Sequence, residues 1–200
     1  MNVAVTAPAG IEDSKAAIRR EAMARRDALP ADMRQAAAEA IAARKFPLAI
    51  APGMVVSGFM PLKSEINPLP LLRKLTAAGA RLALPVVAGR GKPLIMRAWH
   101  WSEPLDEGVW GIRQPMPEAP EVAPDIVLAP LAAFDRTGHR IGYGAGYYDL
   151  TIAGLRADKA VVAIGIAFAV QEIASVPATP RDARLDLVLT EREVIDCRRA

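Results

Sequence analysis

A glycine-rich segment in the second half of the chain carries residue types that bind phosphate. It runs from Arg140 to Asp149 and has glycines at positions 142, 144 and 146. Glycine adopts positive φ angles and has no Cβ to block a ligand, so successive backbone N–H groups can converge on an anion. The Arg140 guanidinium can grip a phosphate through two parallel hydrogen bonds. Asp149 supplies a carboxylate of the kind that binds Mg²⁺ beside phosphate oxygens.

Two familiar phosphate motifs do not match this segment. No Gly-Lys-Ser/Thr follows, as a Walker A loop requires, and the glycine spacing differs from that of a Rossmann fingerprint. A helix expected from Tyr147 to about Arg156 would direct its positive N-terminal end at the same anion. The alternative is a glycine-rich turn with Tyr147 and Tyr148 packed in the core, but Arg140 and Asp149 on either side favour a nucleotide-phosphate site.

Helical and strand patterns alternate along the chain and predict the scaffold around this segment. Helices are expected over residues 14–28, 31–45, 67–78 and 147–156, and strands over residues 54–59, 81–87, 94–101, 125–130, 161–168 and 185–190. The continuous apolar run 161–168 is typical of a strand covered on both faces, and Pro85 limits its strand to an edge or an end of the sheet. The order predicts an α/β fold with three α/β/α layers and a mostly parallel central sheet. Ligands in such folds bind at the carboxyl ends of strands, for example in the loop after Pro130.

Composition narrows the class of protein. A length of 200 residues suits one domain, expected over residues 13–200 behind a flexible tail of residues 1–12. The net charge of +3 is too small to argue for nucleic acid, and RNA binding would rest on the basic helix over residues 14–28 alone. The longest apolar stretch, residues 160–170, is shorter than the roughly 20 residues that span a bilayer. With no signal-peptide pattern and one cysteine, Cys197, we expect a cytoplasmic enzyme without membrane or nucleic-acid partners.

The residues in and around the glycine-rich segment resemble the signature of the 5-formyltetrahydrofolate cyclo-ligases, also called 5,10-methenyltetrahydrofolate synthetases. The matching pattern is Phe134-Asp-x-x-Gly138-x-Arg140-Ile-Gly142-Tyr-Gly144-x-Gly146-Tyr-Tyr-Asp149. Further segments match in the same order, namely Lys15-x-x-x-Arg19, Gly58-Phe-Met-Pro-Leu-Lys-Ser-Glu65, Trp110-Gly-Ile-x-x-Pro115 and Gly165-Ile-Ala-Phe168-x-x-Gln171 with the later Asp182. The resemblance extends over residues 14–190, nearly the whole chain.

The resemblance implies a ligase reaction that uses ATP and Mg²⁺. ATP phosphorylates the formyl oxygen of 5-formyltetrahydrofolate, N10 attacks the activated carbon, the ring closes to 5,10-methenyltetrahydrofolate, and ADP and phosphate are released. Such a reaction asks the protein mainly for positioning and charge neutralisation. The resemblance also implies an architecture like that of sugar-phosphate isomerases and CoA-transferase-like proteins. We expect a monomer whose partners are 5-formyltetrahydrofolate and ATP.

The resemblance also carries roles onto individual residues. Catalytic roles fall on Arg140, Tyr148 and Asp149. Nucleotide binding falls on Lys15, Arg19, Arg140, Ile141, Gly142, Tyr143, Gly144, Ala145, Gly146, Tyr147 and Tyr148. Folate binding falls on Phe59, Met60, Glu65, Trp110 and Tyr147. The metal ligands are expected to be Asp149 and Asp182, with Asp186 as a weaker alternate.

Physical chemistry supports several of these roles. Lys15 and Arg19 lie four residues apart and share one helix face. Arg26 continues that face, and for it we keep the alternative of a solvated basic surface. The Glu65 carboxylate can accept two hydrogen bonds from the donor-rich edge of a pterin, and Trp110 can stack on a flat ring.

Three positions depart from the family pattern: Ala145 stands where many relatives have Gly, Leu150 where Arg often follows, and Arg181 where His often precedes the metal-binding Asp. Two other functions stay open. One is a sugar-phosphate isomerase-like enzyme, which would need no ATP. The other is a non-catalytic paralogue that binds folate or nucleotide. The joint presence of Lys15, Arg19, Glu65, Arg140 and Asp149 argues against it.

Overall fold

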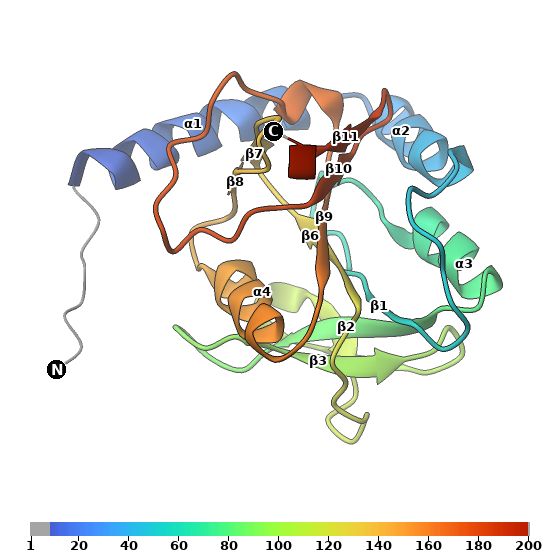
Figure 1. Cartoon of the computed structure of the whole chain (residues 1–200). Coiled ribbons are helices and arrows are strands. Elements are labelled where there is room, and N and C mark those ends of the chain that lie inside the picture. The colour runs from blue at the N-terminus through green and yellow to red at the C-terminus, as the bar shows by residue number, and fades with distance from the viewer. Residues whose placement is uncertain (1–8, 200) are drawn as a thin grey trace, which may run out of the picture.

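A seven-stranded sheet runs through the computed structural model, which describes residues 9–199 (Figure 1). Its strands lie in the order β11 (Val194–Asp196), β10 (Leu187–Leu189), β9 (Val162–Ile166), β6 (Ile126–Pro130), β1 (Val55–Ser57), β2 (Arg81–Val87) and β3 (Leu94–Trp99). The inner strands pair in parallel, whereas β11 and β3 at the two edges run antiparallel to their neighbours. The expected α/β fold with a mostly parallel central sheet is confirmed.

Helices pack against both faces of this sheet. Side chains alternate between the two faces along a strand, and β6 shows which helices cover each face. Ile126 and Leu128 share a buried cluster with residues of α2 (Ala31–Ala43) and α3 (Leu69–Ala77). Val127 and Ala129 belong to a second cluster, which includes Ile152 of α4 (Tyr147–Asp158). Figure 1 accordingly shows α2 and α3 on one side of the strands and α4 on the other.

The first helix, α1, spans Ala9–Asp27 and begins earlier than expected. Residues 9–12 are helical, so that part of the predicted flexible tail is wrong, while residues 1–8 of the predicted tail lie outside the described residues. The Glu12 carboxylate in the first turn interacts favourably with the positive N-terminal end of the helix. Ala22 is fully buried and packs with Ala133 and Ile141, which fixes α1 across one end of the molecule (Figure 1).

Several short elements were not expected from the sequence. They are the hairpin of β4 (Leu105–Glu107) and β5 (Arg113–Pro115) around the 3-10 turn η1 (Val109–Gly111), the pair β7 (Ala133–Phe134) and β8 (Arg140–Ile141), and the 3-10 turns η2 (Ala169–Gln171) and η3 (Cys197–Arg199). Residues 110–124, which lie between two of the expected strands and to which the sequence pattern assigns no element, thus contain β5. Strand β2 lies between β1 and β3, so the strand that contains Pro85 is not at an edge of the sheet. Only residues 81–83 of β2 pair with β1, however, so Pro85 lies beyond the part of β2 that pairs with β1.

Within residues 9–199, no helix combines the length and hydrophobicity needed to cross a bilayer.

Candidate active site

A pocket of about 410 Å³ opens at the carboxyl ends of the central strands. Phe59 and Met60 of its wall follow β1, Val87 ends β2, and Pro130 ends β6. In parallel sheets the loops after the strands gather at one edge. The expectation that the loop after Pro130 contributes to a ligand site therefore agrees with the position of the pocket.

The pocket brings together most of the residues singled out from the sequence. It is lined by Phe59, Met60, Glu65, Trp110, Arg140, Gly142, Tyr143, Ala145, Gly146, Tyr147, Tyr148 and Asp149. Lys15, Arg19, Gly144 and Asp182 lie beside this wall without lining it. Ile141 is 1% exposed and packs in the core, so its side chain is structural. The binding and catalytic roles of all these residues stay predictions.

The glycine-rich segment forms the turn between β8 and α4. Gly144 and Gly146 have φ angles of 98° and 68°, and Gly146 is the N-cap of α4. Arg19 lies over this turn: its Nε donates to the carbonyl of Gly142 at 2.7 Å. Among the residues that the structure describes, the only non-glycine positive φ angles are at Lys63 and Trp110. Ala145 therefore adopts a backbone conformation that its Cβ tolerates, as expected for a position without positive φ.

Asp149 and Arg140 form an ion pair at the edge of the pocket. Arg140 Nη2 donates to Asp149 Oδ1 at 2.9 Å, and the backbone N–H of Ala183 donates to the same oxygen at 3.0 Å. The Arg140 side chain is only 3% exposed, and its burial lowers its pKa, an effect that the Asp149 carboxylate opposes. Within residues 9–199 the hydrogen bonds of the Asp149 carboxylate all engage Oδ1. Oδ2 is left for another ligand.

Asp182, the other predicted metal ligand, is occupied by protein groups. Lys15 Nζ donates to both of its carboxylate oxygens, at 2.9 and 2.7 Å, and Thr179 donates to Oδ2 through its backbone N–H and its hydroxyl. Burial acts to raise the pKa of Asp182, but the hydrogen bonds from Lys15 and Thr179 outweigh it and keep that pKa below its usual range. Lys15, which was predicted to contact phosphate, thus forms an ion pair with Asp182, which was predicted to bind the metal.

Asp186, the alternate, has a structural position. Its Oδ2 accepts hydrogen bonds from Arg156 and from the backbone N–H of Ala163, both at 2.7 Å, and so links β9 to the start of β10. In the described part of the chain, no cluster of three or more His, Cys, Asp or Glu side chains is arranged to hold a metal ion. A metal at this site would therefore need ligands from water or from a bound phosphate.

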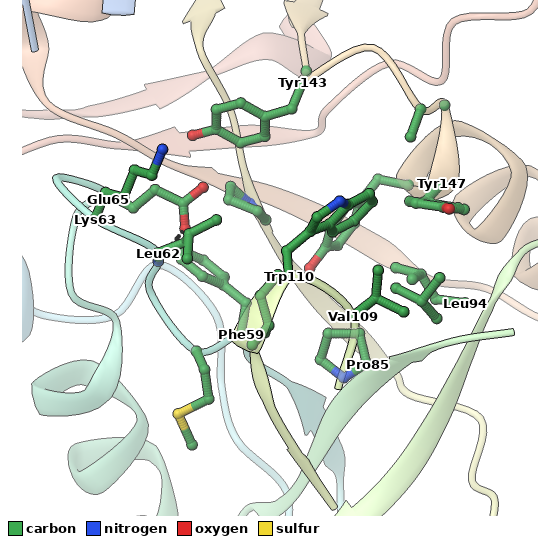
Figure 2. Close-up of a pocket in the computed structure, with 18 of the residues that line it drawn as sticks. Phe59, Leu62, Lys63, Glu65, Pro85, Leu94, Val109, Trp110, Tyr143 and Tyr147 are labelled. Carbon is green, nitrogen blue, oxygen red and sulfur yellow. Dashed lines mark hydrogen bonds between the residues drawn. The ribbon is translucent and has the colours of Figure 1, made fainter. Parts of the chain in front are cut away.

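Glu65 lies at the opposite end of the pocket in an enclosed position. Its Oε2 accepts a hydrogen bond from the backbone N–H of Leu62 at 2.8 Å. Burial raises the pKa of Glu65 above its usual range, although Leu62, Tyr143 and Arg26 all favour the ionised form. Figure 2 shows the Tyr143 hydroxyl on the side of the pocket where Glu65 lies.

Trp110 extends over the pocket from the tip of the β4–β5 hairpin. Its backbone has φ 60° and ψ 21°, a left-handed conformation that is uncommon for a bulky residue. Its side chain is 63% exposed, and its ring centroid lies 6.3 Å from that of Tyr147 at an angle of 50°. Figure 2 shows the indole between the Glu65 side and the Tyr147 side of the pocket. An exposed aromatic ring held by a strained turn is typical of a ligand contact.

Arg26 is the pocket residue that the sequence interpretation placed wrongly. The continuation of the Lys15–Arg19 face suggested a solvated surface, but Arg26 is 2% exposed and lines the pocket. The face is a real one. Because this side of α1 packs onto the site, Lys15 and Arg26 are buried and Arg19 is partly covered. The spacing of Lys15, Arg19 and Arg26 places them on one helix face, but it does not show whether that face meets solvent or protein.

Comparison with known proteins decides the family. The model of the 5-formyltetrahydrofolate cyclo-ligase family matches residues 11–191. The chain belongs to this family. A 5-formyltetrahydrofolate cyclo-ligase of Mycolicibacterium smegmatis is 32% identical over 193 residues, which cover 91% of this chain and 96% of that protein. Its counterpart in Escherichia coli is 31% identical over 147 residues, covering 70% of this chain and 79% of that protein.

Solved structures agree with the assignment to the cyclo-ligase family. The 5,10-methenyltetrahydrofolate synthetase of Aquifex aeolicus superimposes with a TM-score of 0.74 at 26% identity, covering 92% of this chain and 93% of that one. A synthetase of the same name from Mycoplasma pneumoniae, with a TM-score of 0.68 and 22% identity, supports the fold alone. The resemblance found in the sequence, and the expectation of an enzyme from this family, are confirmed.

Proposed function

We propose that this cyclo-ligase family member converts 5-formyltetrahydrofolate to 5,10-methenyltetrahydrofolate with the use of ATP and Mg²⁺, releasing ADP and phosphate. The supporting observation is a pocket with two chemically different ends (Figure 2). One end carries the start of α4, with Arg140 and Asp149, and the other is largely apolar around the half-buried Glu65. Two substrates, one anionic and one with a flat ring, would meet in such a pocket.

The charged end suits the phosphates of ATP. The positive N-terminus of α4 and the glycine turn favour an anion there, and Arg140 brings a buried guanidinium that can neutralise charge on a phosphoryl group. The formyl oxygen would attack the γ-phosphorus as the bond to ADP breaks. N10 would then attack the activated carbon, and the C–O bond would break to release phosphate. Both steps depend on alignment and charge neutralisation.

Asp149 is the side chain best suited to hold Mg²⁺ here. Its Oδ2 faces no protein donor among residues 9–199, while Oδ1 is fixed by Arg140 and Ala183. Asp149 would hold Mg²⁺ beside the phosphates, where the ion would supply neutralisation of their charge. Asp182 would become a second ligand only after Lys15 moves from its carboxylate, for example onto a phosphate.

The apolar end suits the folate. Glu65 would accept hydrogen bonds from the donor edge of the pteridine, and Trp110, with Phe59 below it, would contact the flat ring system. The cytoplasmic location and the monomeric state expected above stay predictions and are part of this proposal.

The direct test is to mix the folded protein with 5-formyltetrahydrofolate, ATP and Mg²⁺ and to follow the absorbance of the methenyl product. Product that depends on both ATP and Mg²⁺ is expected. Folate binding without product would indicate the non-catalytic paralogue instead. Turnover of a sugar phosphate without ATP would indicate the isomerase-like alternative.

Glu65→Gln should chiefly weaken folate binding. The substitution keeps the size of the side chain but removes the charge, so the KM for 5-formyltetrahydrofolate should rise by about tenfold, as expected for a lost charge-assisted hydrogen bond. The KM for ATP should stay within about twofold. Because burial raises the pKa of Glu65, activity of the unchanged protein should fall on acidification at a higher pH than an ordinary glutamate would cause, and this limb should disappear in Glu65→Gln. A defect confined to ATP would contradict the assignment.

Gly144→Ala should weaken ATP binding. The residue would have to adopt φ 98°, which costs an L-amino acid about 1–3 kcal/mol, and its Cβ would lie 3.8 Å from the Arg19 guanidinium. We expect a rise in the KM for ATP with little change in that for folate. Gly154→Ala is the matched control, since Gly154 lies in α4 and a Cβ added there would meet open space. Equal effects of the two substitutions would argue against a role for the turn.

A further inference from the structure

Arg26 is a buried cation whose role the proposed reaction leaves unexplained. It lies in the last turn of α1, is 2% exposed, and lines the pocket near Glu65 rather than near the phosphate end. A guanidinium carries five N–H donors, and burial requires that most of them find acceptors. Its contacts therefore show what the residue holds in place.

These contacts join three separate segments around the folate end of the pocket. Arg26 Nη1 donates to the Tyr143 hydroxyl at 2.7 Å, and the guanidinium carbon lies 5.8 Å from the centroid of the same ring. Arg26 Nε donates to Ser64 Oγ at 3.1 Å and to Asp27 Oδ1 at 3.2 Å. Ser64 in turn donates to Asp27 Oδ1. One side chain of α1 thus fixes the loop that carries Glu65 and the tyrosine of the glycine-rich segment.

Tyr143 shows why the hydroxyl contact matters. The residue is 42% exposed, yet its hydroxyl accepts a hydrogen bond from Arg26 and lies 3.4 Å from the carbonyl oxygen of Leu131, to which it donates. These contacts hold the ring in the pocket wall beside Glu65 (Figure 2).

We propose that Arg26 is a positioning residue for the pteridine end of the substrate, which holds the Tyr143 ring and the residue 62–65 turn so that the Glu65 carboxylate faces the pocket. The inference rests on the proposed folate reaction. It assigns Arg26 to the folate half of the site, although the same helix face supplies Lys15 and Arg19 to the phosphate half.

The charges around Glu65 give the proposal a second readout. Arg26 approaches from α1, Tyr143 from the glycine-rich turn, Tyr148 from α4, and Lys63 lies on the same loop as Glu65. Arg26 and Tyr143 favour the ionised carboxylate against the effect of burial. Removal of the guanidinium should therefore raise the pKa of Glu65 further and move the acid limb of kcat/KM to higher pH.

The test compares Arg26→Gln, Arg26→Lys and Tyr143→Phe with Arg20→Gln, a control that removes the same charge from an exposed position of the same helix. Arg26→Gln should raise the KM for 5-formyltetrahydrofolate by about tenfold or more, as for a lost buried charged donor, with the KM for ATP nearly unchanged and the acid limb shifted to higher pH. Arg26→Lys should recover part of this loss. Tyr143→Phe should show a smaller effect, and its combination with Arg26→Gln should be less than additive.

Folate binding without ATP, measured by titration calorimetry, separates this inference from the proposed reaction. If the unchanged protein forms no methenyl product, but Arg26→Gln still weakens folate binding, the proposed reaction is contradicted and the positioning role of Arg26 is supported. The positioning role is overturned if Arg26→Gln or Tyr143→Phe impairs both substrates equally, or if the acid limb does not move in a folded Arg26→Gln protein. Tyr143→Phe removes a single hydroxyl, so it decides the matter should Arg26→Gln fail to fold.

Discussion

Replacing Arg140 by alanine should lower kcat by about a hundredfold or more, the loss typical when a preorganised charge is removed from a transition state. The guanidinium is 3% exposed and already fixed, since it bonds to Asp149 and to the carbonyl of Ala183. It would therefore neutralise charge on the transferring phosphoryl group without reorganisation. Steady-state rates of methenyl formation at saturating ATP, folate and Mg²⁺ measure this effect.

Loss of stability must be separated from loss of catalysis in this variant. Arg140→Ala leaves the Asp149 carboxylate without its cation, so Arg140→Lys serves as a second variant that keeps a charge but loses the two-pronged geometry. Arg136→Ala is the matched control, because Arg136 is 55% exposed and its ion pairs with Glu172 and Glu193 lie at the surface. Unchanged kcat and unchanged KM for ATP in folded Arg140→Ala would show that Arg140 does not bind phosphate.

Asp149→Asn should also reduce kcat by about a hundredfold or more, because Mg²⁺ prefers charged oxygen ligands and supplies much of the charge neutralisation in phosphoryl transfer. The amide keeps an oxygen for the hydrogen bonds from Arg140 and Ala183, so the fold should be retained. The expected signature is a rise in the Mg²⁺ concentration needed for half-maximal activity, measured by titration at fixed ATP.

Two further substitutions make the magnesium test specific. Asp158→Asn, at the exposed C-terminal end of the same helix, should leave the Mg²⁺ titration unchanged. Asp182→Asn separates the two predicted ligands: a weaker Mg²⁺ dependence than that of Asp149→Asn is expected, since Lys15 occupies the Asp182 carboxylate. If Asp182→Asn shifted the titration and Asp149→Asn did not, the metal would belong to Asp182.

The long apolar segments made most of the fold predictable. Strands β6 and β9 are short apolar runs that are almost entirely buried, and each run can be recognised without reference to the rest of the chain. The two-residue strands β7 and β8 were missed because a pairing of this length leaves no periodicity in the sequence. The start of α1 at Ala9 was missed because Asp13 and Ser14, further along the chain, are residue types that commonly begin a helix.

The candidate site was predictable where local sequence determines geometry. The glycine turn and the start of α4 at Tyr147 depend on neighbouring residues, and both lie where expected. The burial of Arg26 could not be read from the helix pattern alone, since a basic helix face has the same spacing whether it meets solvent or Tyr143. The left-handed backbone of Trp110 likewise depends on the β4–β5 hairpin. No short sequence motif predicts the register of that hairpin.

The contacts of Lys15 and Arg19 have a consequence for folding of the chain during its synthesis on the ribosome. Lys15 meets Asp182 across 167 positions of the chain, and Arg19 meets Gly142 across 123. Contacts between such distant residues form late, because a long intervening chain must first be ordered. A nascent chain that has already made α1 must therefore keep this cationic face without its partners until Asp182 has left the ribosome. Nucleotide affinity should consequently appear only at the end of folding, and a binding assay on chains stalled at increasing lengths would follow its onset.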